Sequence, residues 1–154
     1  MMRASGILLP ISSIPSNYGI GCFSKEAYAF VDQLAEAGQK YWQILPLGPT
    51  GYGDSPYQSF STFAGNPYFI DLEELIQRDL LTAAECAECD WGGSKSYVDY
   101  EKVYLSRFSL LRKAYRRFYQ MDGKEKELQL IREEMEAFEK EQASGLQIIV
   151  FIWQ

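Results

Sequence analysis

The sequence predicts an α/β fold in which a helix, a buried strand and a long loop are followed by a mostly helical second part. Apolar residues at helical spacing over residues 27–34 precede a continuous apolar run at residues 41–47. Residues 48–67 are rich in Gly, Pro, Ser, Asn and aromatic residues without a sustained period, which is typical of a long ordered loop. From residue 97 onward, apolar residues recur three and four positions apart, which predicts amphipathic helices.

The first helix is expected to begin after Ser24 and to end near Gly38. Ser is favoured at the N-terminal cap of a helix, and Gly is favoured just past its C-terminus. The apolar face of this helix consists of Ala27, Phe30, Val31 and Leu34. The buried strand follows directly, at residues 41–47.

Two short helices are expected after the long loop, linked near residues 79–81. Asp71 with Glu74, and Thr82 with Glu85, have the spacing of a capping box, in which the two side chains bond each other's backbone N–H groups. Each pair stands directly before a short stretch that can form a helix.

Two longer helices are predicted between residues 97 and 143, with a break at residues 122–123. We expect them to pack as an antiparallel hairpin. The basic face of the first, residues 112–117, and the acidic face of the second, residues 133–139, would then attract each other weakly. The apolar residues that predict the two helices are Tyr104, Phe108, Leu111, Tyr115 and Phe118, followed by Leu128, Ile131, Met135 and Phe138.

The composition indicates a globular protein and excludes two classes of partner. With 154 residues, of which 47% are apolar and 15% aromatic, the chain can bury the core of one medium domain. A net charge of −6 opposes attraction to nucleic acids and to anionic membranes. The N-terminal apolar run is short and is interrupted by Pro10, so it does not resemble a signal peptide and we expect a cytoplasmic protein.

The cysteines do not predict a metal centre or a disulfide framework. Cys86 and Cys89 have the spacing of a metal or redox pair, but a zinc site needs about four ligands, and Cys22 is the only other thiol. The sequence contains no histidine, which excludes Ser-His, Cys-His and His-metal catalytic arrangements within it. We therefore expect incidental cysteines and no cofactor.

The segment at residues 51–58 is the candidate functional site, because it follows the predicted strand directly. Loops after buried strands carry ligands in many enzymes. A tyrosine ring can lie against the face of a pyranose, and Ser, Asp and Gln side chains can bond sugar hydroxyls. A Gly/Pro turn with scattered tyrosines explains the spacing equally well. The candidate sugar-binding residues are Tyr52, Asp54, Ser55, Tyr57 and Gln58.

Three long motifs cover about half of the chain. Residues 5–21 read SGILLPISSIPSNYGIG, residues 42–58 read WQILPLGPTGYGDSPYQ, and residues 59–72 read SFSTFAGNPYFIDL. In these motifs the sequence resembles the 4-alpha-glucanotransferases called amylomaltases or disproportionating enzymes. The helical part after residue 97 is similar in character but carries no diagnostic motif.

The resemblance implies a (β/α)8 barrel with inserted helical subdomains and a retaining transfer reaction. Such enzymes move α-1,4-glucan segments to glucose or maltooligosaccharide acceptors, using one carboxylate as nucleophile and a second carboxylic acid as general acid and base. In the family both carboxylates come from later strands, so no Asp or Glu of this sequence is assigned a catalytic role. No cofactor is implied.

The resemblance also implies roles for the candidate residues. Tyr57 would stack on the sugar beside the scissile bond, and Tyr52 would contact the glucan at a neighbouring position. Ser55 and Asp54 would bond sugar hydroxyls or shape the loop, and Gln58 completes the expected set of contacts.

A barrel of this kind typically needs ~250 residues, so the resemblance implies an N-terminal fragment without transferase activity of its own. Residues 1–96 would begin the catalytic barrel, residues 97–143 would form an inserted helical hairpin, and residues 144–154 would be an aberrant tail. Residues 148–154 read IIVFIWQ, where the family has a segment similar to DYALFMA, and a one-base deletion in the gene would produce this change.

Two other functions fit parts of the sequence. A non-catalytic carbohydrate-binding module would use the tyrosines between Tyr52 and Tyr57 without chemistry. An interaction protein would instead bind a partner through the helical hairpin at residues 97–143, although burial against a larger domain explains its apolar stripe more simply.

Overall fold

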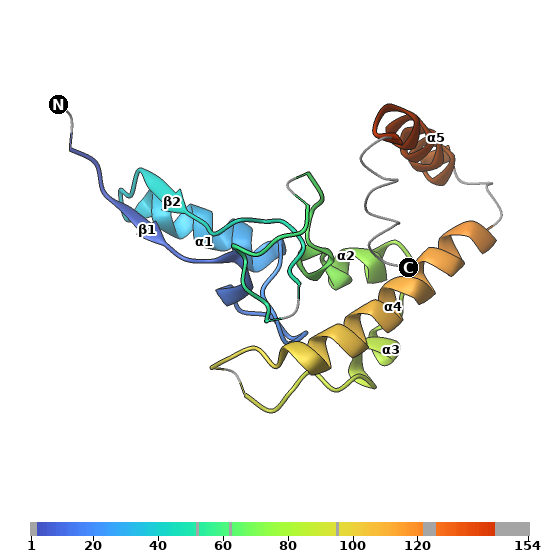
Figure 1. The fold of residues 1–154 in the computed structure, drawn as a ribbon, viewed down its shortest axis with the longest axis horizontal. Helices are drawn as coiled ribbons and strands as arrows, with labels where there is room; N and C mark the ends of the chain where they lie inside the picture. The colour runs from blue at the N-terminus through green and yellow to red at the C-terminus, as the bar shows by residue number, and fades with distance from the viewer. Residues whose placement is uncertain (1–2, 52, 62, 95, 122–125, 144–154) are drawn as a thin grey trace.

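The computed structural model describes residues 3–51, 53–61, 63–94, 96–121 and 126–143, and only the backbone of residues 126–128. Figure 1 shows an elongated arrangement in which the strands and α1 lie at one end and α5 lies near the other. In chain order the elements are β1 (Gly6–Leu8), the 3-10 helix η1 (Ile11–Ser13), α1 (Lys25–Glu36), β2 (Tyr41–Gln43), the 3-10 helix η2 (Pro67–Phe69), α2 (Leu72–Gln77), α3 (Ala83–Ala87), α4 (Tyr100–Gln120) and α5 (Lys126–Glu141).

The strands β1 and β2 form a two-stranded parallel sheet, and α1 connects them along the chain. Gly6 pairs with Tyr41 and Leu8 pairs with Gln43. The ladder continues through the N–H of Leu9, which donates to the Gln43 carbonyl oxygen at 3.0 Å. A helix between two parallel strands is the connection expected of an α/β fold.

The prediction of a buried strand at residues 41–47 is wrong in length and in burial. β2 contains three residues, and the Tyr41 side chain is 67% exposed. The ladder ends there, and the Leu9 carbonyl oxygen accepts from the indole N–H of Trp42 at 2.8 Å. The Trp42 ring packs against Phe30 of α1 at 5.1 Å between centroids, so α1 covers one side of the sheet.

The first helix matches its prediction. α1 begins after Ser24, and Gly38 follows its end with a φ of 70°, a left-handed conformation that glycine adopts without strain. The Ser24 hydroxyl donates to a carboxylate oxygen of Glu26 at 2.7 Å, and it makes no side-chain bond to the helix backbone. Ala27 is buried in this helix, whereas Val31 is 46% exposed.

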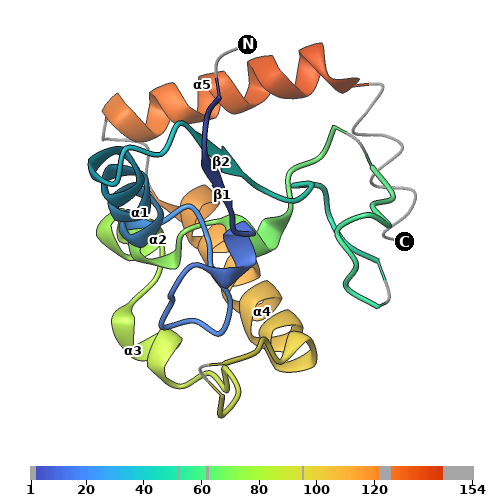
Figure 2. The same ribbon diagram turned by 90° about the vertical axis from the view of Figure 1, so that its left-hand side faces the viewer.

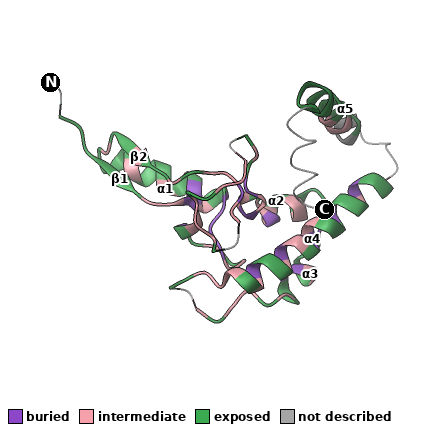
Figure 3. Ribbon diagram, in the orientation of Figure 1, coloured by how far each residue is buried: buried purple, intermediate pink, exposed green. Residues whose placement is uncertain are grey.

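The core lies where α2, α3 and the middle of α4 meet, as the purple segments of Figure 3 show. A second, smaller cluster joins Ile20, Tyr68 of η2 and Val103 of α4. The first cluster consists of Leu72, Leu80, Leu81, Cys86, Leu110, Ala114 and Phe118. α4 contributes to both clusters and therefore connects the two halves of the described chain.

The buried face of α4 agrees with the predicted one only in part. Phe118 is buried, Phe108 and Leu111 pack against the two core clusters, and Tyr104 and Tyr115 are 40% and 59% exposed. The other four buried residues each stand one position before a predicted one. The buried residues of α4 are Val103, Arg107, Leu110, Ala114 and Phe118.

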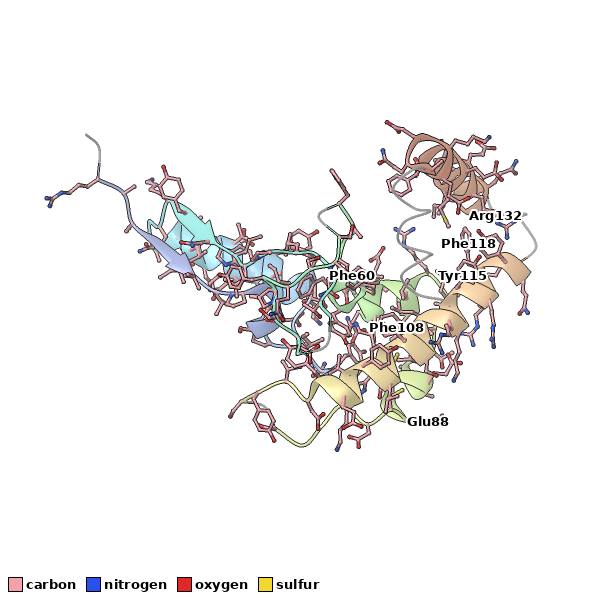
Figure 4. The ribbon with its side chains drawn as sticks, viewed as in Figure 1. Phe60, Glu88, Phe108, Tyr115, Phe118 and Arg132 are labelled. Carbon is pink, nitrogen blue, oxygen red and sulfur yellow. The ribbon has the colours of Figure 1, made fainter. Side chains whose placement is uncertain are left out.

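The two long helices exist as predicted, but their described contacts gather at the C-terminal end of α4. Arg132 of α5 donates to the carbonyl oxygens of Phe118 and Met121 at 2.7 and 2.8 Å. Its guanidinium also lies 5.3 Å from the centre of the Phe118 ring, and Figure 4 shows both side chains between the two helices. Figures 1 and 2 show α5 crossing beyond the end of α4, so the expected packing along the length of both helices is not seen in the described residues.

The basic face of α4 forms its described ion pairs with Glu85 of α3. The predicted attraction was to the acidic face of α5. Arg117 binds Glu85 through two hydrogen bonds, at 3.0 and 2.9 Å, and also donates to the Leu80 carbonyl oxygen. Lys113 lies 3.8 Å from the same carboxylate. Glu85 therefore joins α3 to α4.

The two short helices appear at the expected places, and one of the two capping boxes is confirmed. Thr82 and Glu85 bond each other's backbone N–H groups at the start of α3. Asp71 caps α2 by accepting from the N–H of Glu73 at 3.0 Å. Glu74 forms an ion pair with Arg78 at 2.7 Å, so the predicted Asp71–Glu74 box is incomplete.

Acid is expected to weaken the fold through Glu85. The bound Arg117 guanidinium, followed by the backbone N–H of Thr82, lowers the pKa of Glu85 to about 2. The pKa of an unfolded Glu is about 4.3, so the unfolded chain binds more protons and stability falls as pH drops from about 4.5 towards 2. Urea unfolding at pH 5 and pH 3 should show a smaller loss for Glu85→Gln than for the wild type, and an unchanged loss for Glu88→Gln on the exposed end of α3. An equal loss in all three proteins would contradict this assignment.

The three cysteines lie in the core or at its edge. Cys22 and Cys86 are buried and Cys89 is half-buried, and burial raises the pKa of each thiol. Within the described ranges, no group of three or more Cys, Asp or Glu residues is placed to hold a metal ion. None of the helices described for this chain is long and apolar enough to cross a membrane.

Candidate functional site

Asn66 fixes the two ends of the long loop. Its N–H donates to the Leu47 carbonyl oxygen at 2.9 Å, and its side-chain amide donates to the Gly48 carbonyl oxygen at 3.3 Å. Its side-chain oxygen accepts from the N–H of Tyr68 at 2.9 Å and so caps η2. Because Asn66 is only 8% exposed, these bonds are shielded from water and hold the base of the loop firmly.

A short bridge narrows the loop above this base. Thr50 and Ser59 pair as an isolated antiparallel bridge, which encloses residues 51–58. Two turns follow inside the bridge. The N–H of Asp54 donates to the Gly51 carbonyl oxygen at 3.1 Å, and the N–H of Gln58 donates to the Ser55 carbonyl oxygen at 3.0 Å. Asp54, Ser55, Tyr57 and Gln58 therefore lie on consecutive tight turns.

The structure separates the candidate residues into an outer and an inner group. The Tyr57 ring is 73% exposed, Gln58 is exposed, and Ser55 beside them is half-buried. Asp54 is half-buried and has a φ of 55°, which is uncommon for a residue with a side chain. Tyr52 lies outside the described residues.

A small cavity of about 120 Å³ lies beneath the loop. Thr50 and Asp54 line it from the loop, and Ser12, Tyr68 and Tyr100 line it from the interior. The Thr50 hydroxyl is buried and makes no hydrogen bond within the described structure. At about 30 Å³ per water molecule, a cavity of this size can hold about four waters.

Asp54 places a carboxylate next to two tyrosine hydroxyls at this cavity. Burial raises the pKa of Asp54 above its usual range. Burial, and after it the charge of Asp54, raises the pKa of Tyr68 to about 12 and also raises the pKa of Tyr100. Both tyrosines therefore stay protonated at neutral pH and can act as hydrogen-bond donors.

Several residues that shape the site were not among the predicted ones. Thr50, Asn66 and Tyr68 lie within the motifs at residues 42–72, and an Asn-Pro pair before an aromatic residue is a recognisable start of a short helix. Tyr100 comes from the N-terminus of α4, and only the three-dimensional structure reveals its proximity to the loop.

Comparisons with known proteins identify the family to which this chain is similar. The family model described as 4-alpha-glucanotransferase matches residues 9–150. The chain belongs to the 4-alpha-glucanotransferase family. The resemblance of its motifs to that family is thereby confirmed.

Individual members of the 4-alpha-glucanotransferase family match closely but are much longer. The enzyme of that name from Streptococcus pneumoniae is 56% identical over 119 residues, which are 77% of this chain and 24% of that protein. The one from Thermus thermophilus is 46% identical over 145 residues, which are 94% of this chain and 27% of that protein. The chain thus spans about a quarter of the length of these curated relatives.

The fold is similar to that of a solved member of this family. An amylomaltase from Streptococcus agalactiae, determined in complex with acarbose, superposes with a TM-score of 0.80 and 41% sequence identity, covering 92% of this chain and 27% of that one. The mixture of helices and strands described above is therefore that of a 4-alpha-glucanotransferase over the matched part.

Proposed function

We propose that residues 50–58 form part of the glucan-binding cleft of a retaining 4-alpha-glucanotransferase. In this proposal residues 1–96 begin a (β/α)8 barrel and residues 97–143 belong to an inserted helical subdomain. The exposed Tyr57 ring carries the proposal, because it stands on a loop that Asn66 holds in place and in a chain of this family.

Each side chain of the loop would make a different kind of contact with the glucan. Tyr57 offers its ring face to a pyranose, and Ser55 and Gln58 offer hydrogen-bonding groups on the same turn. Asp54, half-buried at the cavity, would hold the turn in shape or bond a sugar hydroxyl. Tyr52 would extend the contact to a neighbouring sugar.

The chemistry itself would need groups from elsewhere. A retaining transfer uses two carboxylic groups about 5–5.5 Å apart, one as nucleophile and one as acid and base. Among the described residues that line the cavity under the loop, Asp54 is the only acid. This part of the cleft would therefore bind and orient an α-1,4-glucan, and it would exclude water from one side of the reacting sugar.

Replacing Tyr57 by alanine should weaken glucan binding. Loss of a ring contact worth about 1 kcal/mol raises the dissociation constant about fivefold. Titration of the chain with maltoheptaose, followed by intrinsic fluorescence, measures this change. Phe63→Ala is the matched control, because Phe63 is an aromatic residue of the same long loop and is 95% exposed. Equal affinities of the wild type and Tyr57→Ala would refute the role of Tyr57.

The 154-residue polypeptide is expected not to disproportionate maltotriose. The binding loop cannot replace a missing nucleophile and proton donor. Chromatography of the products after prolonged incubation should show maltotriose alone. Glucose together with longer glucans would contradict the assignment of the carboxylates to other parts of the family's sequence. Micromolar affinity without turnover would favour a non-catalytic binding module.

A further inference from the structure

A groove of about 1020 Å³ lies between α2, α4 and α5. It is continuous with the core, because Leu80 and Phe118 belong to the first core cluster and also line the groove. Phe108, Tyr115 and Phe118 follow one another along it, and Figure 4 shows them on α4 leading towards Arg132 of α5. We call it the apolar groove. Its apolar lining includes Leu75, Leu80, Phe108, Leu111, Ile131 and Met135.

The lining of the apolar groove fits an uncharged, apolar occupant. At about 30 Å³ per water molecule, an open groove of this size would hold about 34 waters, most of them against carbon. Soluble monomers rarely leave a large contiguous apolar patch open to solvent. Arg112 and Arg116 also line the groove, but both are exposed, so their charged ends can stay in water beside an apolar segment.

The chain itself contains a segment of this chemistry. Residues 148–153 read IIVFIW, and their side chains carry no charge and a single polar group, the indole N–H of Trp153. Residues 144–154 lie outside the described residues. They follow α5, which supplies Ile131 and Met135 to the groove, so the apolar segment is tethered to one of its walls.

The chain between α5 and the apolar segment is long enough to reach the groove. From Ala143, the last described residue, back to Met135 the distance is about 12 Å at the rise of an α-helix. Residues 144–147 can span up to about 14 Å when extended, so Ile148 can lie beside Met135. Residues 148–153 can then extend about 20 Å further, which is nearly the length of four helical turns.

We propose that residues 148–153 fold back onto the apolar groove and cover it within the same molecule. The tether favours this occupant over a second copy. At an effective concentration of about 1 mM, a groove that binds the segment with a Kd of only about 0.1 mM is about nine-tenths occupied. A covered groove cannot bind an apolar helix of another chain, so the polypeptide stays monomeric. This proposal is independent of glucan binding by the loop at residues 50–58.

Fluorine NMR of the 154-residue chain labelled with fluorinated tryptophan tests the proposal. Trp153→Phe identifies the Trp153 signal beside those of Trp42 and Trp91. A soluble gadolinium chelate should relax Trp153 about tenfold less than a free indole, equally in dilute and concentrated samples. Relaxation like that of a free indole would overturn the proposal. Protection confined to concentrated samples would assign the groove to a second copy and would also overturn it.

Substitutions on two sides of α5 separate binding at the groove from general effects on the helix. Met135→Glu places a charge in the apolar groove and should abolish the protection of Trp153. Leu130→Glu is the matched control, because Leu130 is 54% exposed on the same helix and does not line the groove. Ile149→Asp alters only the segment and should also abolish the protection, so the test holds even if Met135→Glu loosens α5. Unchanged protection in all three variants would overturn the proposal.

Removal of the segment should uncover the apolar groove. A chain that ends at Gln147 should bind more of the dye ANS than the full chain, and it should associate with itself in sedimentation experiments. ANS fluorescence that is unchanged by the truncation would contradict coverage of the groove by residues 148–153.

Discussion

Replacing Gly21 by alanine is expected to destabilise the chain by about 3 kcal/mol or more. A Cβ atom at this position would lie 2.2 Å from the Ile11 carbonyl oxygen and 2.5 Å from the Ile14 carbonyl oxygen. Both are backbone atoms of the turn around η1, so they cannot move aside as the end of a side chain could. The N–H of Gly21 also donates to the Ser12 carbonyl oxygen at 3.0 Å, and a shift of the backbone would break this bond.

Urea unfolding followed by circular dichroism measures this loss. Gly65→Ala is the matched control, because no described atom outside the adjacent residues lies within 4 Å of the added Cβ at that position. The control should unfold within about 0.5 kcal/mol of the wild type, as surface substitutions usually do. Equal midpoints for Gly21→Ala and the wild type would show that the segment after β1 is looser than the structure describes.

Replacing Arg107 is also expected to lower the stability of the chain strongly. The loss should depend on the size of the side chain that replaces it. The side chain is fully buried in the middle of α4, and its Nη2 atom donates to the Ile70 carbonyl oxygen. Nε and Nη1 are buried without a hydrogen-bond partner in the described structure. Burial lowers the pKa of Arg107, against the opposing influence of the nearby Cys22 thiol. The charge is therefore poorly compensated where it lies.

Arg107→Ala should lose about 3 kcal/mol of stability, because it leaves a cavity between the two core clusters. Arg107→Met fills most of that volume and removes the buried charge, so it should lose less than about 1.5 kcal/mol. Both variants lose the bond to Ile70 and the buried charge, so the difference between them measures packing alone. If the two variants unfold at the same urea concentration, the bond to Ile70 is the dominant contribution and the packing explanation fails.

Local signals in the sequence predicted the elements whose ends depend on nearby residues. Gly38 ends α1, and Thr82 with Glu85 begins α3, because caps and left-handed turns involve atoms only a few residues apart. The loop at residues 48–67 followed from its composition. Its outer turn carries Ser55, Tyr57 and Gln58 together, as the spacing suggested.

Features that depend on distant residues were not predictable in the same way. The apolar run at residues 41–47 looks continuous, yet β2 ends at Gln43, next to the point where the Leu9 carbonyl oxygen accepts from the Trp42 indole N–H. The buried face of α4 includes Arg107 beside the predicted Phe108, and the spacing of apolar residues cannot indicate that a charged side chain is buried there. The partner of Arg117 is Glu85, and only the docking of α3 on α4 determines that pair.

The cavity under the loop likewise depends on residues that are distant in the sequence. Asp54 was predicted to bond a sugar hydroxyl or to shape the loop, and it lies at the cavity close to Tyr68 and Tyr100. These tyrosines come from η2 and α4, which are separated from the loop along the chain. The sequence suggested candidate residues in the loop, and the packing around the loop shows which of the described ones face the solvent.

Soaking a crystal of this chain with maltotriose would show whether the loop binds glucan. We expect a sugar ring stacked on Tyr57, with Ser55 or Gln58 bonded to its hydroxyl groups. Maltotriose ordered elsewhere on the chain while the Tyr57 ring remains bare would contradict it.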